Sequence, residues 1–215
     1  MAKQRAVSDE EFRENARSDE YRLRCRERLL AAGCELFSSR GYVHTTLEDL
    51  CAEAGVSERE FHQEFTSQEA LLIALHDEVT SCGLRAAESA LLAEGMDQCS
   101  TRERVALLFD AYVLAVTRDP RAARVAFVEV LGVSHRVDEH LLMWRNRWVE
   151  FLTAEAERAV SRGEAADREH GVTVVVTIGS CNELMAHHSR RPRQVTPAEV
   201  SAELTRLSLA MLGAP

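Results

Sequence analysis

Apolar residues recur along almost the whole chain with the three-to-four-residue spacing of amphipathic α-helices. In the first such segment they fall on one helical face: Leu29, Leu30, Leu36 and Phe37. Gly41 follows, and a glycine just past the last periodic residue is a common helix end. The pattern predicts a first helix over residues 19–39. No segment shows the alternation of a half-buried strand, so we expect an all-α fold.

Three more helix starts follow closely. The pattern predicts a second helix over residues 46–54, capped by Thr46, and a third over 57–65, capped by Ser57. Gly55 supplies the tight turn between them, and Ser67 caps a long fourth helix over 67–93. Two short helices joined by a glycine turn are the arrangement with which helix-turn-helix proteins place one helix in a DNA groove.

Five further helices are predicted in the remainder, separated by turn residues such as Asp119-Pro120 and Arg162-Gly163. They span residues 101–117, 122–131, 137–161, 166–189 and 197–212. With about nine helices in all, the expected organisation has three parts. These are a flexible charged arm over 1–18, a helix-turn-helix domain over 19–66, and a helical body over 67–215 with the fourth helix as connector.

Composition narrows the class of protein. The chain has 215 residues, of which 46% are hydrophobic, an ordinary value for a folded protein. It contains no apolar run of ~18 residues and no signal-like start, so we expect a cytoplasmic protein with no membrane partner. Lys3 is the only lysine among 26 basic residues. This arginine bias indicates a GC-rich, bacterial coding genome.

The sequence lacks the motifs of common enzyme classes. It has no Gly-x-Ser-x-Gly elbow, no glycine-rich phosphate loop and no His-Glu-x-x-His motif. We therefore expect no enzymatic activity and no cofactor. Its six cysteines lack the spacing of a zinc site or a disulfide framework. Two lesser alternatives stay open: Glu183 and His187 share a helix face as metal ligands would, and Cys25 lies near arginines that would lower its pKa if it were exposed.

Residues 24–75 carry a series of short motifs in a fixed order. They are Ala31-Ala32, Leu36-Phe37, Arg40-Gly41-Tyr42, Thr45-Thr46, Ala54-Gly55-Val56-Ser57, Phe65, Ser67 and Glu69-Ala70-Leu71-Leu72. In this order and spacing, the segment resembles the DNA-binding head of the TetR (tetracycline repressor) family of transcriptional regulators. The resemblance implies a homodimer in which residues 19–66 bind a double-stranded DNA operator. Residues 67–215 would bind a small-molecule effector and carry the dimer interface.

The resemblance also implies that the second threonine of the pair and the polar residues of the third helix touch DNA. With Gln68 and two arginines of the first helix, the candidate set is Thr46, Ser57, Glu58, Arg59, Glu60, His62, Gln63, Gln68, Arg22 and Arg24. Arg59 could grip a guanine through two hydrogen bonds, and Gln63 could pair with an adenine. Glu58 and Glu60 could accept hydrogen bonds from cytosine amino groups.

The charge of this region departs from the family pattern. Relatives usually carry a Gly-Thr pair, an aliphatic residue and Tyr where this chain has Arg59-Glu60-Phe61-His62, and Gln68 and Glu64 replace a frequent lysine and a frequent aromatic residue or histidine. Residues 45–78 hold nine acidic residues and one arginine, and such a surface repels a polyanion. Arginines that could reach DNA phosphates would offset this repulsion. They are Arg13, Arg17, Arg22, Arg24, Arg26 and Arg28.

Two functions therefore stay open. The first is a ligand-responsive transcriptional repressor that a small molecule releases from a palindromic operator. The second is a helix-turn-helix-shaped dimer that has lost DNA affinity and acts as a small-molecule or protein-binding module.

Aromatic residues recur at helical spacing in the body. Trp144, Trp148 and Phe151 fall at positions i, i+4 and i+7 and could flank a ligand-sized cleft. The expected ligand-binding set is Phe109, Tyr112, Phe127, Trp144, Trp148, Phe151 and Asn182. Arg145 and Asn146 could also orient a ligand. The alternative for each aromatic residue is ordinary core packing.

Family analogy places the dimer seam on the last two predicted helices. Their apolar surface exceeds what is needed to cover one body, and a four-helix bundle across a two-fold axis would bury it. The residues concerned are Val172, Val175, Val176, Gly179, Leu184, Leu204, Leu207, Leu209 and Met211.

Overall fold

The computed structural model describes residues 9–213, with side chains from Asp19 onward. Within this range the chain forms nine α-helices and three short helical turns and has no β-strand, which confirms the all-α prediction. None of the described helices combines the length and the apolarity that crossing a membrane requires. The chain divides into two compact units, with the boundary between Leu71 and Leu72.

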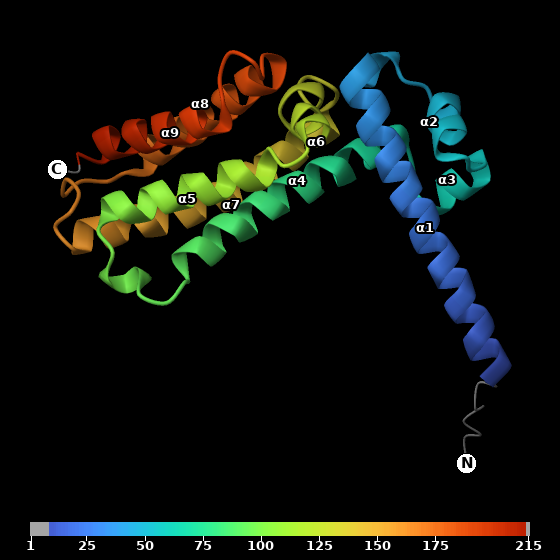
Figure 1. Ribbon diagram of the computed structural model, residues 1–215, viewed down its shortest axis with the longest axis horizontal. Helices are drawn as coiled ribbons and strands as arrows, with labels where there is room; N and C mark the ends of the chain where they lie inside the picture. The colour runs from blue at the N-terminus through green and yellow to red at the C-terminus, as the bar shows by residue number, and fades with distance from the viewer. Residues whose placement is uncertain (1–8, 214–215) are drawn as a thin grey trace. The chain divides into compact units, whose positions relative to one another are not determined.

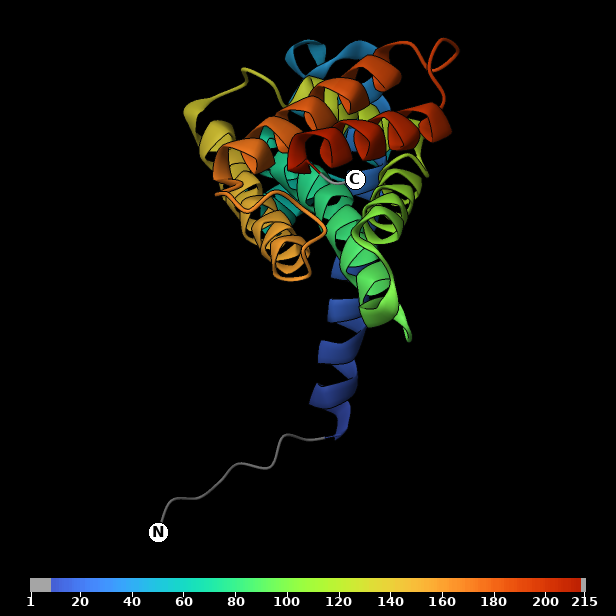
Figure 2. The same ribbon diagram turned by 90° about the vertical axis from the view of Figure 1, so that its left-hand side faces the viewer.

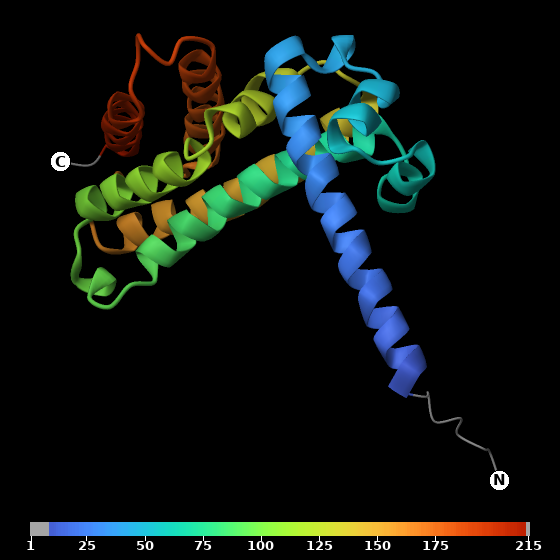
Figure 3. The ribbon, with the colours of Figure 1, turned by 45° about the vertical axis from the view of Figure 1, so that its right-hand side comes forward.

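The first unit is the helix-turn-helix head. Its helices are α1 (Asp9–Arg40), η1 (Tyr42–His44), α2 (Leu47–Ala54), α3 (Glu58–Glu64) and the start of α4 (Gln68–Leu91). Figure 3 shows α2 and α3 folded against α1, and both helices contact it. The centre of the unit is made of fully buried side chains from these three helices: Leu29, Phe37, Leu50 and Phe61.

Local capping fixes the start of each short helix. The Thr46 side chain accepts the Asp49 backbone N–H, and the Asp49 carboxylate accepts the Thr46 backbone N–H. Ser57 and Glu60 form the same reciprocal capping box at α3. Gly55 has φ +61°, the left-handed conformation that ends α2 and turns the chain into α3. These starts agree with the prediction because capping depends on neighbouring residues.

The first helix begins at Asp9 rather than at the predicted Asp19. The intervening residues include no glycine or proline that would stop a helix. Acidic residues also fill the first turn, where they complement the positive end of the helix dipole. The arm expected over residues 1–18 is thus helical from Asp9, and residues 1–8 lie outside the described range.

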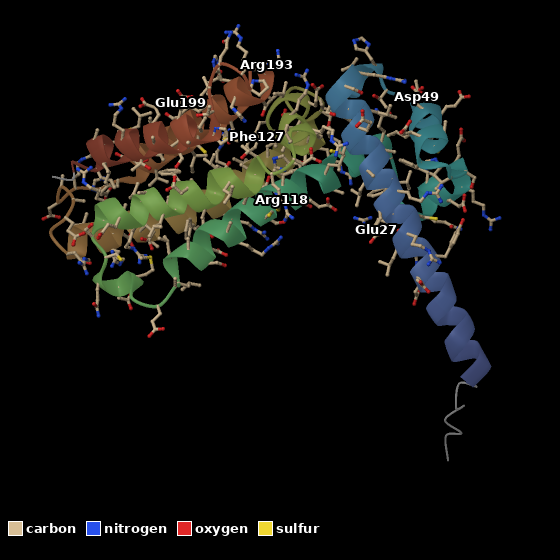
Figure 4. The ribbon with its side chains drawn as sticks, in the orientation of Figure 1. Glu27, Asp49, Arg118, Phe127, Arg193 and Glu199 are labelled. Atoms are coloured by element: carbon tan, nitrogen blue, oxygen red, sulfur yellow. The ribbon has the colours of Figure 1, made fainter. Side chains whose placement is uncertain are left out.

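The second unit is a helical body in which α8 and α9 lie side by side over α5 and α7 (Figures 1 and 2). Besides most of α4, its elements are η2 (Met96–Gln98), α5 (Thr101–Val116), α6 (Pro120–Arg124), η3 (Val125–Glu129), α7 (His135–Ser161), α8 (Gly171–Arg190) and α9 (Pro197–Leu212). Its core unites α4, α5, α8 and α9, with central side chains Val79, Leu108, Phe109, Val113, Met185, Val200 and Leu204. Reciprocal capping recurs at α9, where Glu199 caps Thr196 (Figure 4).

Two predicted helices of the body have different bounds. The helix predicted over 122–131 starts earlier, at Pro120 behind its Asp119 cap, and widens into the π-helical turn η3. The five-residue spacing of this turn brings Val125 and Val130 into the core, and Glu129 pairs with Arg124 at 3.1 Å.

The helix predicted from residue 166 begins only at Gly171. The segment before it is held against the end of α9. Ala166 N–H donates to the Leu212 carbonyl at 3.0 Å, and Arg168 Nη2 donates to the Met211 carbonyl at 2.6 Å. These tertiary hydrogen bonds replace the first helical turn.

Candidate DNA-reading face and ligand cavity

The outer face of α3 is polar and accessible. Its exposed side chains are Ser57 at the N-cap, Glu58, Arg59, His62 and Gln63. Phe61, on the opposite face, is fully buried and packs 6.0 Å from Phe65, ring centre to ring centre. Thr46 is likewise exposed at the start of α2. Most of the predicted DNA-reading residues are therefore exposed, and those of α3 share its outer face.

The carboxylates of Glu60 and Glu64 are engaged inside the head. Glu60 accepts hydrogen bonds from the Ser57 backbone at 2.7 Å and from the Tyr21 hydroxyl of α1. The bond from Tyr21, followed by those from Ser57, lowers the pKa of Glu60 to about 2, and the same bond raises the pKa of Tyr21 to about 12. Glu64 is only 8% exposed and pairs with Arg22 at 2.9 Å. The charge of Glu64 is thus offset by Arg22, whereas Glu60 stays ionised.

The arginines of α1 also have partners within the head. Arg24 pairs with Glu20 at 2.8 Å, and the Arg26 guanidinium lies 4.5 Å above the Phe65 ring. Arg28 donates to the Gly55 carbonyl at 2.6 Å and so ties α1 to the turn between α2 and α3. The side chains of Arg13 and Arg17 lie outside the described part of the chain.

Gln68 holds the segment before α2. Its amide donates to the carbonyls of Tyr42 and Thr45 at 3.1 and 2.8 Å. On α2, Asp49 caps Thr46 and lies 3.4 Å from Arg40 (Figure 4 labels Asp49). Sequence reasoning missed the roles of Tyr21 and Arg28, because their partners lie 39 and 27 residues away.

The body contains a cavity with about 280 Å³ of free volume. Its wall comes from α4, α5, η3, α7 and α8. Five residues of the predicted ligand-binding set line it: Tyr112, Phe127, Trp144, Trp148 and Asn182. Phe127 lies just beyond α6 in Figure 4. Arg145 also lines the cavity, whereas Asn146 is exposed and does not.

Two smaller hollows continue this cavity into the body. The nearer one, about 30 Å³, shares Tyr112, Trp148 and Asn182 with the large cavity. The farther one, about 50 Å³, shares Phe109, Leu152 and Thr177 with the nearer one. Phe109 therefore lines the deeper part of this row. Phe151 lies outside all three hollows and packs edge-on against Trp148, with 5.8 Å between ring centres.

A histidine network adjoins the large cavity, which His76 lines. His76 of α4 is 6% exposed, and its Nδ1 lies 3.1 Å from His140 Nε2 of α7. His140 Nε2 lies 3.4 Å from Asp77 Oδ1, which also accepts the Trp144 indole N–H at 2.6 Å. Burial, and then His140, lowers the pKa of His76 to about 3. Sequence reasoning missed this network; its signal was a histidine and a threonine, His76 and Thr80, one turn apart in an apolar helix.

The two alternative chemistries lose their support. Cys25 is buried, so it is not the exposed thiol that redox sensing requires. Glu183 lines the large cavity and His187 does not. Within the described residues, no group of three or more His, Cys, Asp and Glu side chains is arranged to hold a metal ion.

One face of α8 exposes a stripe of valines. Val172, Val175 and Val176 are 80%, 51% and 47% exposed, and Gly179 continues the stripe. Two other residues expected at the seam, Leu204 and Leu209, are buried inside the body instead. They point inward because α9 packs against α5. Leu184, Leu207 and Met211 are half-buried.

A capped recognition-type helix on a small head, joined in one chain to a helical body with a cavity, is the arrangement found in helix-turn-helix regulators. Residues 29–75 match the family model of bacterial regulatory proteins, tetR family. The HTH-type transcriptional regulator EthR of Mycolicibacterium smegmatis is 25% identical over 184 residues, covering 84% of this chain and 82% of EthR. The matched residues, 29–75, lie in the head, the segment whose sequence motifs resemble the TetR family.

Solved structures show the same fold. A bacterial regulatory protein in the tetR family from Rhodococcus RHA1 has a TM-score of 0.72 and 22% identity, over 89% of this chain and 98% of that one. The transcriptional regulator FadR of Bacillus subtilis, solved in complex with stearoyl-CoA, has a TM-score of 0.73 and 14% identity, over 86% and 97%. The fold match thus extends over both head and body.

Proposed function

We propose that this protein is a ligand-responsive repressor: a homodimer that binds a palindromic operator and leaves it when a small amphiphilic molecule fills the cavity of the body. The main support is the outer face of α3. It presents Arg59, His62 and Gln63 to solvent, while Glu60 and Glu64 are held by α1. A rigid helix with free polar side chains is what direct reading of the major groove requires.

Each exposed residue of this face has a proposed role. Arg59 makes two hydrogen bonds to a guanine, and Gln63 pairs with an adenine. Thr46 and Ser57, at the starts of α2 and α3, contact phosphates, which are attracted by helix N-termini. Arg24, exposed on α1, adds a phosphate contact.

The proposed dimer joins two copies through the valine stripe of α8, Val172 to Gly179. Valines this exposed on a helix of one protomer favour burial against an equivalent surface. Gly179 allows close approach, because nothing lies within 4 Å of a Cβ built there. Two heads in such a dimer reach successive major-groove turns when they are about 34 to 36 Å apart.

The proposed effector is an elongated molecule with an apolar tail. The row of hollows past Tyr112, Trp148 and Phe109 has mainly apolar walls, and polar side chains such as Arg145 and Asn182 lie at its wide end. FadR, which shares the fold, was solved with stearoyl-CoA. An effector that prefers a different separation of the heads weakens operator affinity, and by linkage the operator weakens effector binding equally.

The test is to capture DNA with the purified dimer from fragments of its own genome at near-physiological salt. We expect recovery of a palindrome. Arg59→Ala should relax the base preference at one position of each half-site, at a cost of about 1 to 3 kcal/mol there. Arg193→Ala is the matched control, because Arg193 is exposed in the turn between α8 and α9 (Figure 4).

Absence of enrichment, from protein shown to be folded and dimeric, would contradict the proposal. It would favour the alternative of a helix-turn-helix-shaped module without DNA affinity. An Arg59→Ala profile identical to that of the wild type would remove the role given to Arg59 and leave the repressor in place.

A further inference from the structure

We propose that the polar end of the cavity recognises the carbonyl oxygen of an acyl head group, through a hydrogen-bond donor that Asp77 and His140 fix on His76. This inference rests on the proposed effector binding and adds the chemistry of the head group to it. A fatty acid and its ester both supply such an oxygen. An amine of the same chain length does not.

Hydrogen bonding around Asp77 determines where His140 carries its proton. Asp77 Oδ1 accepts the Trp144 N–H at 2.6 Å and lies 3.4 Å from His140 Nε2. An ionised carboxylate only accepts hydrogen bonds, so the contact is favourable when His140 bears its proton on Nε2. The contact with Asp77 thus favours the tautomer of His140 that carries its proton on Nε2.

The same nitrogen then sets the tautomer of His76. His140 Nε2 lies 3.1 Å from His76 Nδ1, so a protonated Nε2 on His140 makes His76 Nδ1 the acceptor. A neutral imidazole has one N–H, and that of His76 must therefore be on its Nε2. Because burial and His140 hold the pKa of His76 at about 3, the ring stays neutral at physiological pH.

The donor on His76 meets the cavity beside Thr80. The Thr80 hydroxyl oxygen is 3.3 Å from His76 Nε2 and 3.4 Å from His76 Nδ1, so it lies off the direction of the Nε2–H bond and does not occupy that donor. Both residues line the cavity. The Thr80 hydroxyl carries a hydrogen of its own and is a second donor beside the N–H of His76. His76 and Thr80 of α4 thus place two hydrogen-bond donors in a largely apolar cavity lining.

The other polar side chains of the cavity lining favour a ligand that accepts hydrogen bonds. They do not require that this ligand carry a negative charge. Arg145 and Asn182 add donors from α7 and α8. Glu183 opposes the charge of Arg145, so these two residues give the lining no net charge. Hydrogen-bond direction, rather than net charge, is then what separates acyl compounds from amines.

The experiment measures binding of dodecanoate, methyl dodecanoate and dodecylamine to the full-length protein by calorimetry and by Trp144 and Trp148 fluorescence. Wild type should bind both acyl compounds about tenfold more tightly than the amine, the effect of roughly one hydrogen bond. His76→Leu and Asp77→Asn should each reduce this ratio to near one. Asp138→Asn, at an exposed acid of α7, should leave it unchanged.

A second readout needs no effector. Nitrogen NMR of the histidine rings should show the His76 proton on Nε2 in the wild type and in Asp138→Asn, and a mixture of tautomers in Asp77→Asn. A proton on Nδ1 in the wild type would overturn the inference, whatever the variants do to stability.

The outcomes also separate this inference from the proposed function. Equal affinity for all three compounds would overturn head-group recognition and leave an amphiphile site standing. Binding of none of them would contradict the proposed effector class and the inference with it. Discrimination that survives in both His76→Leu and Asp77→Asn would show that other groups read the head group.

Discussion

Side chains of the same kind take different roles according to their neighbours. On α3, Glu58 is exposed, whereas Glu60 caps its own helix and accepts from Tyr21, and Glu64 is covered and paired with Arg22. Hydrogen bonds to the charged form lower the pKa of Glu60, so this carboxylate stays ionised as a fixed structural group. Glu60 thus keeps its negative charge, and only the charge of Glu64 is offset, by Arg22.

His76 gives the body a stability that depends on pH. Its pKa is about 3 in the folded protein, because of burial and His140, against about 6.5 in an unfolded chain. Below pH 6.5 the unfolded chain gains a proton that the folded chain does not take, so acid lowers the unfolding free energy. The contribution of His76 should be about 1.4 kcal/mol for each pH unit.

Urea unfolding at pH 7.5 and 5.5 measures this effect. His76→Gln should lose less unfolding free energy than the wild type between these two pH values. His135→Gln, which alters an exposed histidine at the start of α7, is the matched control and should follow the wild type. Equal pH dependence in His76→Gln and wild type would show that His76 titrates normally.

Residue roles were predictable from the sequence where they depend on neighbours along the chain. The caps Thr46 and Ser57 fall in this class. The contacts of Tyr21, Arg22 and His76 join residues that are distant in sequence, and only packing brings them together. That is why the aromatic wall of the cavity could be predicted in part and its histidine network could not.

At the scale of elements, α4 passes close to α5 at Gly83. A Cβ built on Gly83 of α4 would lie 2.6 Å from Val116 Cγ1 and 2.9 Å from Tyr112 Cε2 of α5. Gly179 of α8 has nothing within 4 Å. One glycine thus permits contact inside the body, and the other is open to solvent.

Alanine at these two glycines should act in opposite directions. Gly83→Ala should destabilise the protein by about 1 to 3 kcal/mol through overpacking. In the protomer, Gly179→Ala should be neutral or stabilise by up to about 1 kcal/mol, since alanine favours a helix. Chemical unfolding at low protein concentration, where the protomer dominates, measures both. Equal effects would contradict the α4–α5 packing described here.

Element bounds followed the sequence where capping and turn residues mark them, as at Gly55 and Pro197. The bounds of helices differ from those predicted where tertiary contacts determine where a helix begins or ends. The late start of α8 depends on hydrogen bonds from Ala166 and Arg168 to the end of α9, and the π-helical turn η3 depends on packing of Val125 and Val130. Neither leaves a periodic signal in the chain.

At the scale of the whole molecule, the proposed function needs two copies. A single head has one short α3, and a palindromic operator is read by two of them related by a two-fold axis. The valine stripe on α8 is the surface proposed to join the copies. DNA affinity and dimerisation should therefore be lost together when this stripe is made polar.

The measurement that tests this account most directly is a titration of the recovered operator with wild type and with Val176→Asp, followed by anisotropy and by sedimentation. Wild type should saturate at two protomers per operator. Val176→Asp should sediment as a folded monomer and bind at least about tenfold more weakly, while Leu114→Asp, at an exposed leucine of α5, should match the wild type. A Val176→Asp protein that stays dimeric with full operator affinity would contradict the proposed α8 interface, and wild type that binds as a single protomer would contradict the dimeric repressor itself.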